Sequence, residues 1–145
     1  MGPAAHALRN GSYYKVALDF CRMPNGETKR VLVVDDNRDS ADSLSLLLRN
    51  EGFIVDTAYD GTEAIRLADA NRPQVVLLDI QMPRLSGYDI VRELRRYERA
   101  PRPHLIAVSA WGQESDKLAA KQAGFDQHLT KPVDPAQLIE LLSKL

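Results

Sequence analysis

The sequence predicts an α/β fold, a doubly wound parallel sheet of five strands with five helices. Short apolar runs alternate along the chain with longer stretches in which apolar residues recur at helical spacing. This alternation is typical of successive βαβ units. The length of 145 residues and the hydrophobic fraction of 44% fit one domain with its own core. The strands are expected near residues 30–34, 54–58, 75–79, 104–108 and 126–129.

The first helix is predicted from a capping signal and an apolar stripe. Asn37, Asp39 or Ser40 can cap its start, and Gly52 ends it. The apolar positions between them recur at helical spacing and are Ala41, Leu44, Leu47 and Leu48. Leu46 lies off this stripe, so it is either an ordinary exposed leucine or a contact for a partner.

The other helices have comparable boundary signals. Asp60 precedes the second helix, Pro73 separates it from the third strand, and Asp134 caps the fifth helix. The fourth helix, about 114–123, has only a weak apolar face. The apolar positions of these four helices, in order, are Ala64, Ile65, Leu67 and Ala68; Tyr88, Ile90, Val91 and Leu94; Leu118, Ala119 and Ala123; and Leu138, Ile139, Leu141 and Leu142.

The first 28 residues stand apart from this pattern. Apolar and other side chains alternate from Tyr14 to Cys21, which favours one strand with no partner in a five-stranded sheet. We therefore divide the chain into an N-terminal extension, 1–28, and a domain, 29–145.

Composition excludes several classes of function. The formal net charge of −1 gives no general attraction for nucleic acid or lipid, and Cys21 alone cannot form an internal disulfide. No stretch is long and apolar enough to span a bilayer, and no secretory signal is recognisable. We expect a reducing, cytoplasmic setting without membrane contact by this chain.

Carboxylates follow two of the predicted strands at the point where each strand ends. Asp35 and Asp36 follow the first strand, and Asp79 ends the third. Because the carboxyl ends of parallel strands share one edge of the sheet, the three side chains are expected to converge. Clustered carboxylates repel one another and need a cation. Oxygen ligands of this kind suit Mg²⁺, which takes further ligands from phosphate oxygens, so the pattern predicts phosphoryl chemistry.

Two further strand ends carry groups suited to the same chemistry. Ser109 follows the fourth predicted strand and offers a hydroxyl, while Lys131 follows the fifth and offers a point charge for phosphate. A cis Lys131–Pro132 bond would aim the lysine inward, although cis is the minority state of such bonds.

The order Asp35-Asp36, Asp79, Ser109 and Lys131-Pro132 on successive strand ends resembles the receiver domain of two-component response regulators. The resemblance covers roughly 29–145 and implies a flavodoxin-like fold. It also implies that Asp79 takes a phosphoryl group from a phosphohistidine in a reaction that depends on Mg²⁺ (or Mn²⁺). Asp36 and Asp79 would bind the ion directly, Asp35 would act through water, and the backbone carbonyl of Gln81 would complete the protein ligands. Ser109 and Lys131 would bond the phosphoryl oxygens.

The family's switch is implied in the same way, with one departure. Phosphorylation draws the hydroxyl of Ser109 inward, and the family fills the vacated space with an aromatic side chain three residues before the lysine. That position here is His128. His128 is thus either a switch residue or a strand histidine without a switching role.

The resemblance implies a signalling domain that catalyses only its own phosphorylation and dephosphorylation, with no organic cofactor. Its expected partners are a histidine kinase or histidine phosphotransfer domain and a downstream protein of unknown identity. The fourth helix, fifth strand and fifth helix form the family's usual dimer face. Residues 11–18 faintly resemble the last strand of a histidine-kinase ATP-binding domain, which would make the parent protein a hybrid kinase. A leader or residues added for expression explain the same segment equally well.

Three other interpretations compete with the receiver. A phosphatase or dehalogenase would carry an Asp-x-Asp motif, but position 81 is Gln81. A flavodoxin-like binding module needs a loop rich in Ser, Thr and Gly where this chain has Asp35-Asp36-Asn37-Arg38. The remaining alternative is a receiver-like interaction domain that works without phosphorylation, and its only support is His128.

Overall fold

The computed structural model describes residues 29–82, 86–96, 102–110 and 114–145. The expected N-terminal extension and its single strand lie outside the described residues. Among the helices that are described, none is long and apolar enough to cross a membrane.

The described strands form one parallel sheet in the order β2-β1-β3-β4-β5. This is the strand order of the flavodoxin-like doubly wound fold, as the sequence predicts. The central strand β3 is buried along its whole length, as expected for a parallel sheet covered on both faces. The strands are β1 (Arg30–Val34), β2 (Ile54–Ala58), β3 (Val75–Asp79), β4 (His104–Ser109) and β5 (Gln127–Thr130).

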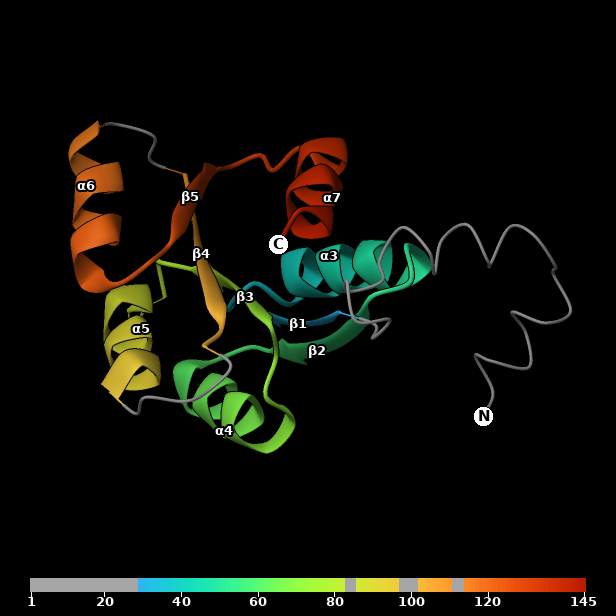
Figure 1. Cartoon of the computed structure of the whole chain (residues 1–145), viewed down its shortest axis with the longest axis horizontal. Helices are drawn as coiled ribbons and strands as arrows, with labels where there is room; N and C mark the ends of the chain where they lie inside the picture. Colours follow the sequence, from blue (N-terminus) through green and yellow to red (C-terminus); the bar gives the residue numbers. More distant parts are fainter. Residues whose placement is uncertain (1–28, 83–85, 97–101, 111–113) are drawn as a thin grey trace, which may run out of the picture.

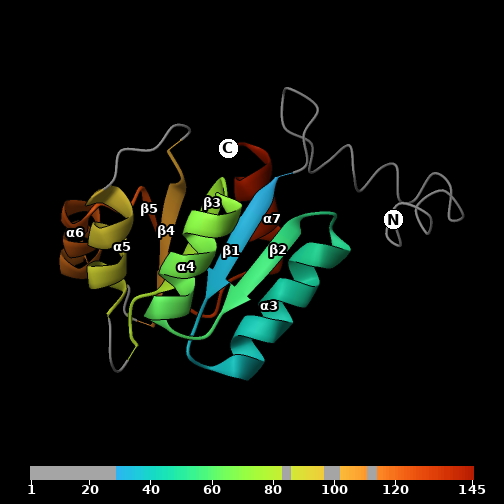
Figure 2. The same ribbon diagram turned by 90° about the horizontal axis from the view of Figure 1, so that it is seen from below.

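Helices cover both faces of the sheet and enclose two apolar clusters (Figure 1). Helices α3 and α7 lie on one face, and α4, α5 and α6 lie on the other. Seen from below, α3 runs alongside the edge strand β2 (Figure 2). The helices are α3 (Arg38–Asn50), α4 (Gly61–Asn71), α5 (Gly87–Arg96), α6 (Glu114–Ala123) and α7 (Pro135–Ser143).

The predicted caps are present, and the structure selects one of three candidates for α3. The side chain of Asn37 accepts a hydrogen bond from the Ser40 N–H at 3.1 Å. Asp60 and Asp134 cap α4 and α7 in the same way. Gly52 follows α3 with a φ of 98°, a left-handed conformation that favours glycine.

The predicted face of α6 is wrong for Leu118 and Ala119, although Ala123 is partly buried as predicted. Leu118 is 56% exposed and Ala119 is also exposed, whereas Ala120 is 1% exposed and packs with Phe125. Ala120 and the half-buried Ala123 lie three residues apart on the same side of the helix. Leu118, two positions before Ala120, therefore points roughly away from the sheet.

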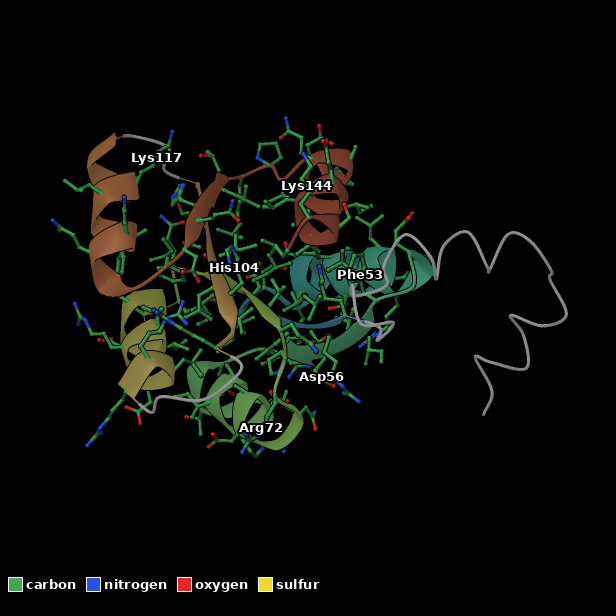
Figure 3. All side chains as sticks on the ribbon, in the orientation of Figure 1. Phe53, Asp56, Arg72, His104, Lys117 and Lys144 are labelled. Carbon is green, nitrogen blue, oxygen red and sulfur yellow. The ribbon has the colours of Figure 1, made fainter. Side chains whose placement is uncertain are left out.

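The remaining helix faces follow the predicted stripes. Leu138 and Leu142, four residues apart on α7, are fully buried, and Leu46 on α3 is exposed as expected. Figure 3 shows the side chains that fill the layers, with Phe53 among those on the α3 and α7 side of the sheet.

Lys29, just before β1, is a buried cation that the sequence did not predict. Its side-chain ammonium donates hydrogen bonds to main-chain oxygens of Leu142 and Leu145. Only 2% of the Lys29 surface is exposed, which is rare for a lysine. The C-terminal end of α7 offsets the burial, because the carbonyl end of a helix carries partial negative charge.

Candidate functional site

The three predicted carboxylates meet at the C-terminal edge of the sheet. Asp35 and Asp36 follow β1, and Asp79 ends the neighbouring strand β3. One oxygen of each lies within 4.8 Å of the others. Asp35 and Asp79 are buried, whereas Asp36 is exposed.

The two buried carboxylates are held by the same local turn. Asp35 Oδ1 accepts the N–H of Asn37 at 3.0 Å, and Asp79 Oδ1 accepts the N–H of Gln81 at 3.0 Å. Aspartate favours such turns because its side chain can bond the backbone two residues ahead. In both residues, the other oxygen, Oδ2, faces Lys131.

Lys131 supplies positive charge from the end of β5. Its Nζ lies 3.2 Å from Asp79 Oδ2 and 3.5 Å from Asp35 Oδ2. The Lys131 N–H donates to the Ser109 carbonyl at 2.7 Å, which anchors the residue beside β4. The Lys131–Pro132 peptide bond is cis.

Burial and neighbouring charges shift the pKa values of Asp35 and Lys131. Burial, the largest cause, and the charge of Asp79 raise the pKa of Asp35, although the Asn37 N–H and Lys131 act in the opposite direction. Burial alone would lower the pKa of Lys131. The negative charges of Asp79 and Asp35 outweigh burial, so the pKa of Lys131 is raised.

The donor set fits a hard divalent cation. Three clustered carboxylates and one ammonium leave two formal negative charges, which a divalent cation would neutralise. Carboxylate oxygens with access to solvent on one side suit Mg²⁺, which keeps several of its waters. The exposed carboxylate of Asp36 gives that access.

Ser109 and His128 are joined by a contact that the sequence did not predict. Ser109 ends β4 and is 2% exposed, and His128 lies on β5 opposite Ala107. The Ser109 Oγ is 3.0 Å from His128 Nε2, within hydrogen-bond distance.

Gly87, the first residue of α5, lies against the backbone at the end of β3. Its N–H donates to the Ile80 carbonyl at 3.1 Å. A Cβ atom at this position would lie 2.6 Å from Ile80 Cα and 3.0 Å from the carbonyl oxygen of Asp79. The sequence carried only a weak signal of this close approach. A glycine inside a helix lowers its stability, so a glycine there suggests that a larger residue would not fit.

A contact that the sequence did not predict, between Arg38 and Tyr59, lies beside the Asp35-Asp36 turn. The guanidinium carbon of Arg38 is 4.1 Å from the ring centroid of Tyr59, close enough for a cation–π contact. The Tyr59 hydroxyl donates to Asp42, and this hydrogen bond is the main reason that the pKa of Tyr59 is raised. The contact connects the start of α3 with the loop after β2.

Comparison with known protein families decides what this arrangement is. The family model described as the response regulator receiver domain matches residues 31–143. The chain belongs to the response regulator receiver family. As a receiver domain of two-component systems, it is a signalling unit whose interaction partner is a histidine kinase or phosphotransfer domain.

Individual relatives agree with this assignment. An uncharacterized 14.6 kDa protein of Leptolyngbya boryana is 37% identical over 114 residues, covering 79% of this receiver and 87% of the relative. The transcriptional regulatory protein PrrA of Mycobacterium tuberculosis is 42% identical over 125 residues, covering 85% of this chain. This receiver spans about half of PrrA, 52% of its length.

Solved structures show the same fold. The chemotaxis protein CheY4 of Vibrio cholerae has a TM-score of 0.76 at 28% identity, covering 81% of this receiver and 98% of that chain. The receiver domain of sensor histidine kinase PA1611 from Pseudomonas aeruginosa has a TM-score of 0.72 at 33% identity, covering 80% of this receiver and 95% of that chain. That structure is described with a magnesium ion coordinated in its active site cleft.

Proposed function

We propose that this receiver is phosphorylated on Asp79 by a phosphohistidine of its partner, in a reaction that depends on Mg²⁺. The observation that carries the proposal is the convergence of three carboxylates and Lys131 at one edge of the sheet. Phosphoryl transfer consists mainly of positioning and electrostatic stabilisation, and this site supplies both.

Asp36 and Asp79 would hold the ion directly, Asp35 would act through water, and Gln81 would contribute its backbone carbonyl. When bound, Mg²⁺ supplies positive charge that lets carboxylate and phosphoryl oxygens approach each other. The turn between Asp79 and Gln81 supports this assignment, because it fixes the carboxylate relative to the Gln81 backbone.

In the transfer step, a carboxylate oxygen of Asp79 attacks the phosphorus atom of the phosphohistidine. A P–O bond forms, the P–N bond breaks, and the electron pair of that bond returns to the leaving imidazole, which takes up a proton from solvent water. The hydrogen bond from the Gln81 N–H to Asp79 Oδ1 orients the nucleophilic carboxylate. Lys131 is close enough to follow the charge from the carboxylate to the phosphoryl oxygens.

The Ser109 hydroxyl would move toward a phosphoryl oxygen and donate a hydrogen bond to it. This movement, together with a response of His128, would form the switch. The buried position of Ser109 at the end of β4 supports the role. The alternative, an interaction domain that works without phosphorylation, has no specific observation in its favour.

We also infer that the domain comprises residues 29–145, with 1–28 as an extension. The buried side chain of Lys29 and its bonds to the end of α7 support this boundary. A chain of residues 29–145 should therefore unfold in urea at the same midpoint as the whole chain. A lower midpoint would place part of the extension in the fold.

Intact mass after incubation with acetyl phosphate, with Mg²⁺ or with a chelator, tests the main proposal. The wild-type chain should gain one phosphoryl group only with Mg²⁺, and the adduct should be lost in alkali. The Asp79→Asn chain should gain none. Asp39→Asn is the matched control, because Asp39 lies in the first turn of α3, outside the cluster, and its loss should leave labelling intact. Equal labelling of Asp79→Asn would refute Asp79 as the acceptor.

A further inference from the structure

The hydrogen bond between Ser109 and His128 joins two neighbouring strands at the proposed switch. Its atoms, Ser109 Oγ and His128 Nε2, are 3.0 Å apart. The receiver family carries an aromatic side chain at the position of His128. A histidine differs from a phenylalanine there because its ring nitrogen can either donate or accept a hydrogen bond.

The direction of this bond controls what Ser109 can offer to a phosphoryl group. A serine hydroxyl has one proton to donate, and a phosphoryl group presents acceptor oxygens. If the neutral imidazole carries its proton on Nδ1, Nε2 accepts and the Ser109 proton is committed to His128. If the proton is on Nε2, the imidazole donates to Oγ, and Ser109 can give its own proton to the phosphoryl oxygen.

Resting on the proposed phosphorylation of Asp79, we infer that His128 is a positioning residue for Ser109. In the phosphorylated domain His128 carries its proton on Nε2 and donates to Oγ, while Ser109 donates to the phosphoryl oxygen. Aligned hydrogen bonds of this kind polarise one another, which makes Ser109 a better donor. Phosphorylation on β3 is thereby linked to the state of a ring on β5.

The nitrogen-15 spectrum of the histidine side chains tests this inference directly. The whole chain would be measured at about pH 8.5, above the ordinary pKa of histidine, so that neutral tautomers are compared. Spectra would be taken with Mg²⁺ alone and with Mg²⁺ and beryllofluoride, a phosphoryl analogue. With the analogue, His128 should show protonated Nε2, and bare Nε2 in that state would overturn the inference.

The chain provides an internal control and a variant that tests the route through Ser109. His104 lies at the other end of β4, where its Nε2 is 2.9 Å from Gln127 Oε1, so its tautomer should not respond. In Ser109→Ala, the nitrogen-15 signals of His128 should no longer respond to beryllofluoride, because the hydroxyl that polarises the imidazole N–H is absent. A response equal to that of the wild type would show that the coupling does not pass through the hydroxyl.

Two replacements of His128 separate hydrogen bonding from filling of space. His128→Gln keeps an N–H donor, whereas His128→Phe keeps a ring without one. We expect His128→Phe to bind beryllofluoride about fivefold more weakly, the effect of one lost hydrogen bond, and His128→Gln to recover most of the affinity. Wild-type affinity in His128→Phe would overturn the inference.

The same experiments separate failure of the inference from failure of the proposed function. A wild-type chain that gains no phosphoryl group and binds no beryllofluoride overturns both. A chain that is phosphorylated on Asp79 but shows bare Nε2 with beryllofluoride overturns only the role of His128.

Discussion

Replacing Asp36 by asparagine should stabilise the domain when no divalent cation is present. The side chain keeps its size and loses one negative charge. Lys131 pairs with the other two members of the cluster, Asp35 and Asp79, so the replacement leaves both of those ion pairs in place. What it removes is repulsion from two buried carboxylates.

The magnitude follows from the geometry of the cluster. The carboxylate oxygens lie within 4.8 Å of one another. Because Asp36 is exposed, a dielectric near that of water is appropriate, which gives about 0.9 kcal/mol for each of the two repulsive pairs. Dissolved salt screens part of this repulsion. We therefore expect the free energy of unfolding to rise by about 1–2 kcal/mol.

Urea unfolding in the presence of a chelator and then with Mg²⁺ provides the assay. An ion that binds only the folded state adds about 2.7 kcal/mol at a concentration 100 times its Kd, and this gain should be much smaller in Asp36→Asn. The stability order of variant and wild type should therefore reverse when Mg²⁺ is added.

Asp39→Asn is the matched control for this experiment. Asp39 lies in the first turn of α3, where a negative charge is favourable, so its loss should lower stability slightly and leave the Mg²⁺ gain unchanged. Reduced stability of Asp36→Asn in the chelator would refute the repulsion argument. A full Mg²⁺ gain in that variant would exclude Asp36 as a ligand.

Three further predictions concern the supports of the site. Gly87→Ala should lower the free energy of unfolding by about 1–3 kcal/mol despite the better helix propensity of alanine, because its Cβ would lie 2.6 Å from a backbone Cα atom; an unchanged urea midpoint would contradict this. Lys29→Met should cost about 1–3 kcal/mol through loss of its bonds to Leu142 and Leu145, whereas Lys144→Met at the exposed C-cap of α7 should change stability by less than about 0.5 kcal/mol. Because the pKa of Tyr59 is raised in the folded protein, its hydrogen bond to Asp42 stabilises the fold below the ordinary tyrosine pKa, and this stabilisation is lost as pH rises through the folded pKa. Ultraviolet titration of Asp42→Asn should therefore show a lower tyrosine pKa than the wild type. An identical titration curve would exclude this hydrogen bond as the cause of the raised pKa.

The sheet and the proposed site residues were predictable because their signals are local. An apolar run that ends at a charged residue, as at Asp79, marks both the strand and the edge where the side chain emerges. Parallel strands then bring Asp35, Asp36 and Asp79 together without further information. The caps at Asn37 and Asp134 are equally local, because each involves a backbone N–H within three residues.

The features that escaped prediction depend on how distant elements meet. The buried face of α6 is centred on Ala120, and a weakly apolar helix does not reveal which side faces the sheet. The bond between Ser109 and His128 depends on the register of β4 and β5, which aligns Ser109 with Thr130. The burial of Lys29 depends on the docking of α7, more than a hundred residues later in the chain.

The arrangement of charges indicates where a phosphorylation signal should leave the site. The ammonium of Lys131 already lies 3.2 Å from Asp79, so it can follow the new charge with little movement on its flexible stem. Ser109 has no such freedom, because it is buried at the end of β4 and bonded to His128 on β5. Drawing the Ser109 hydroxyl toward a phosphoryl group must alter a contact between two strands. We therefore expect the conformational response to concentrate on β4 and β5 rather than on β1, although β1 precedes two of the three carboxylates.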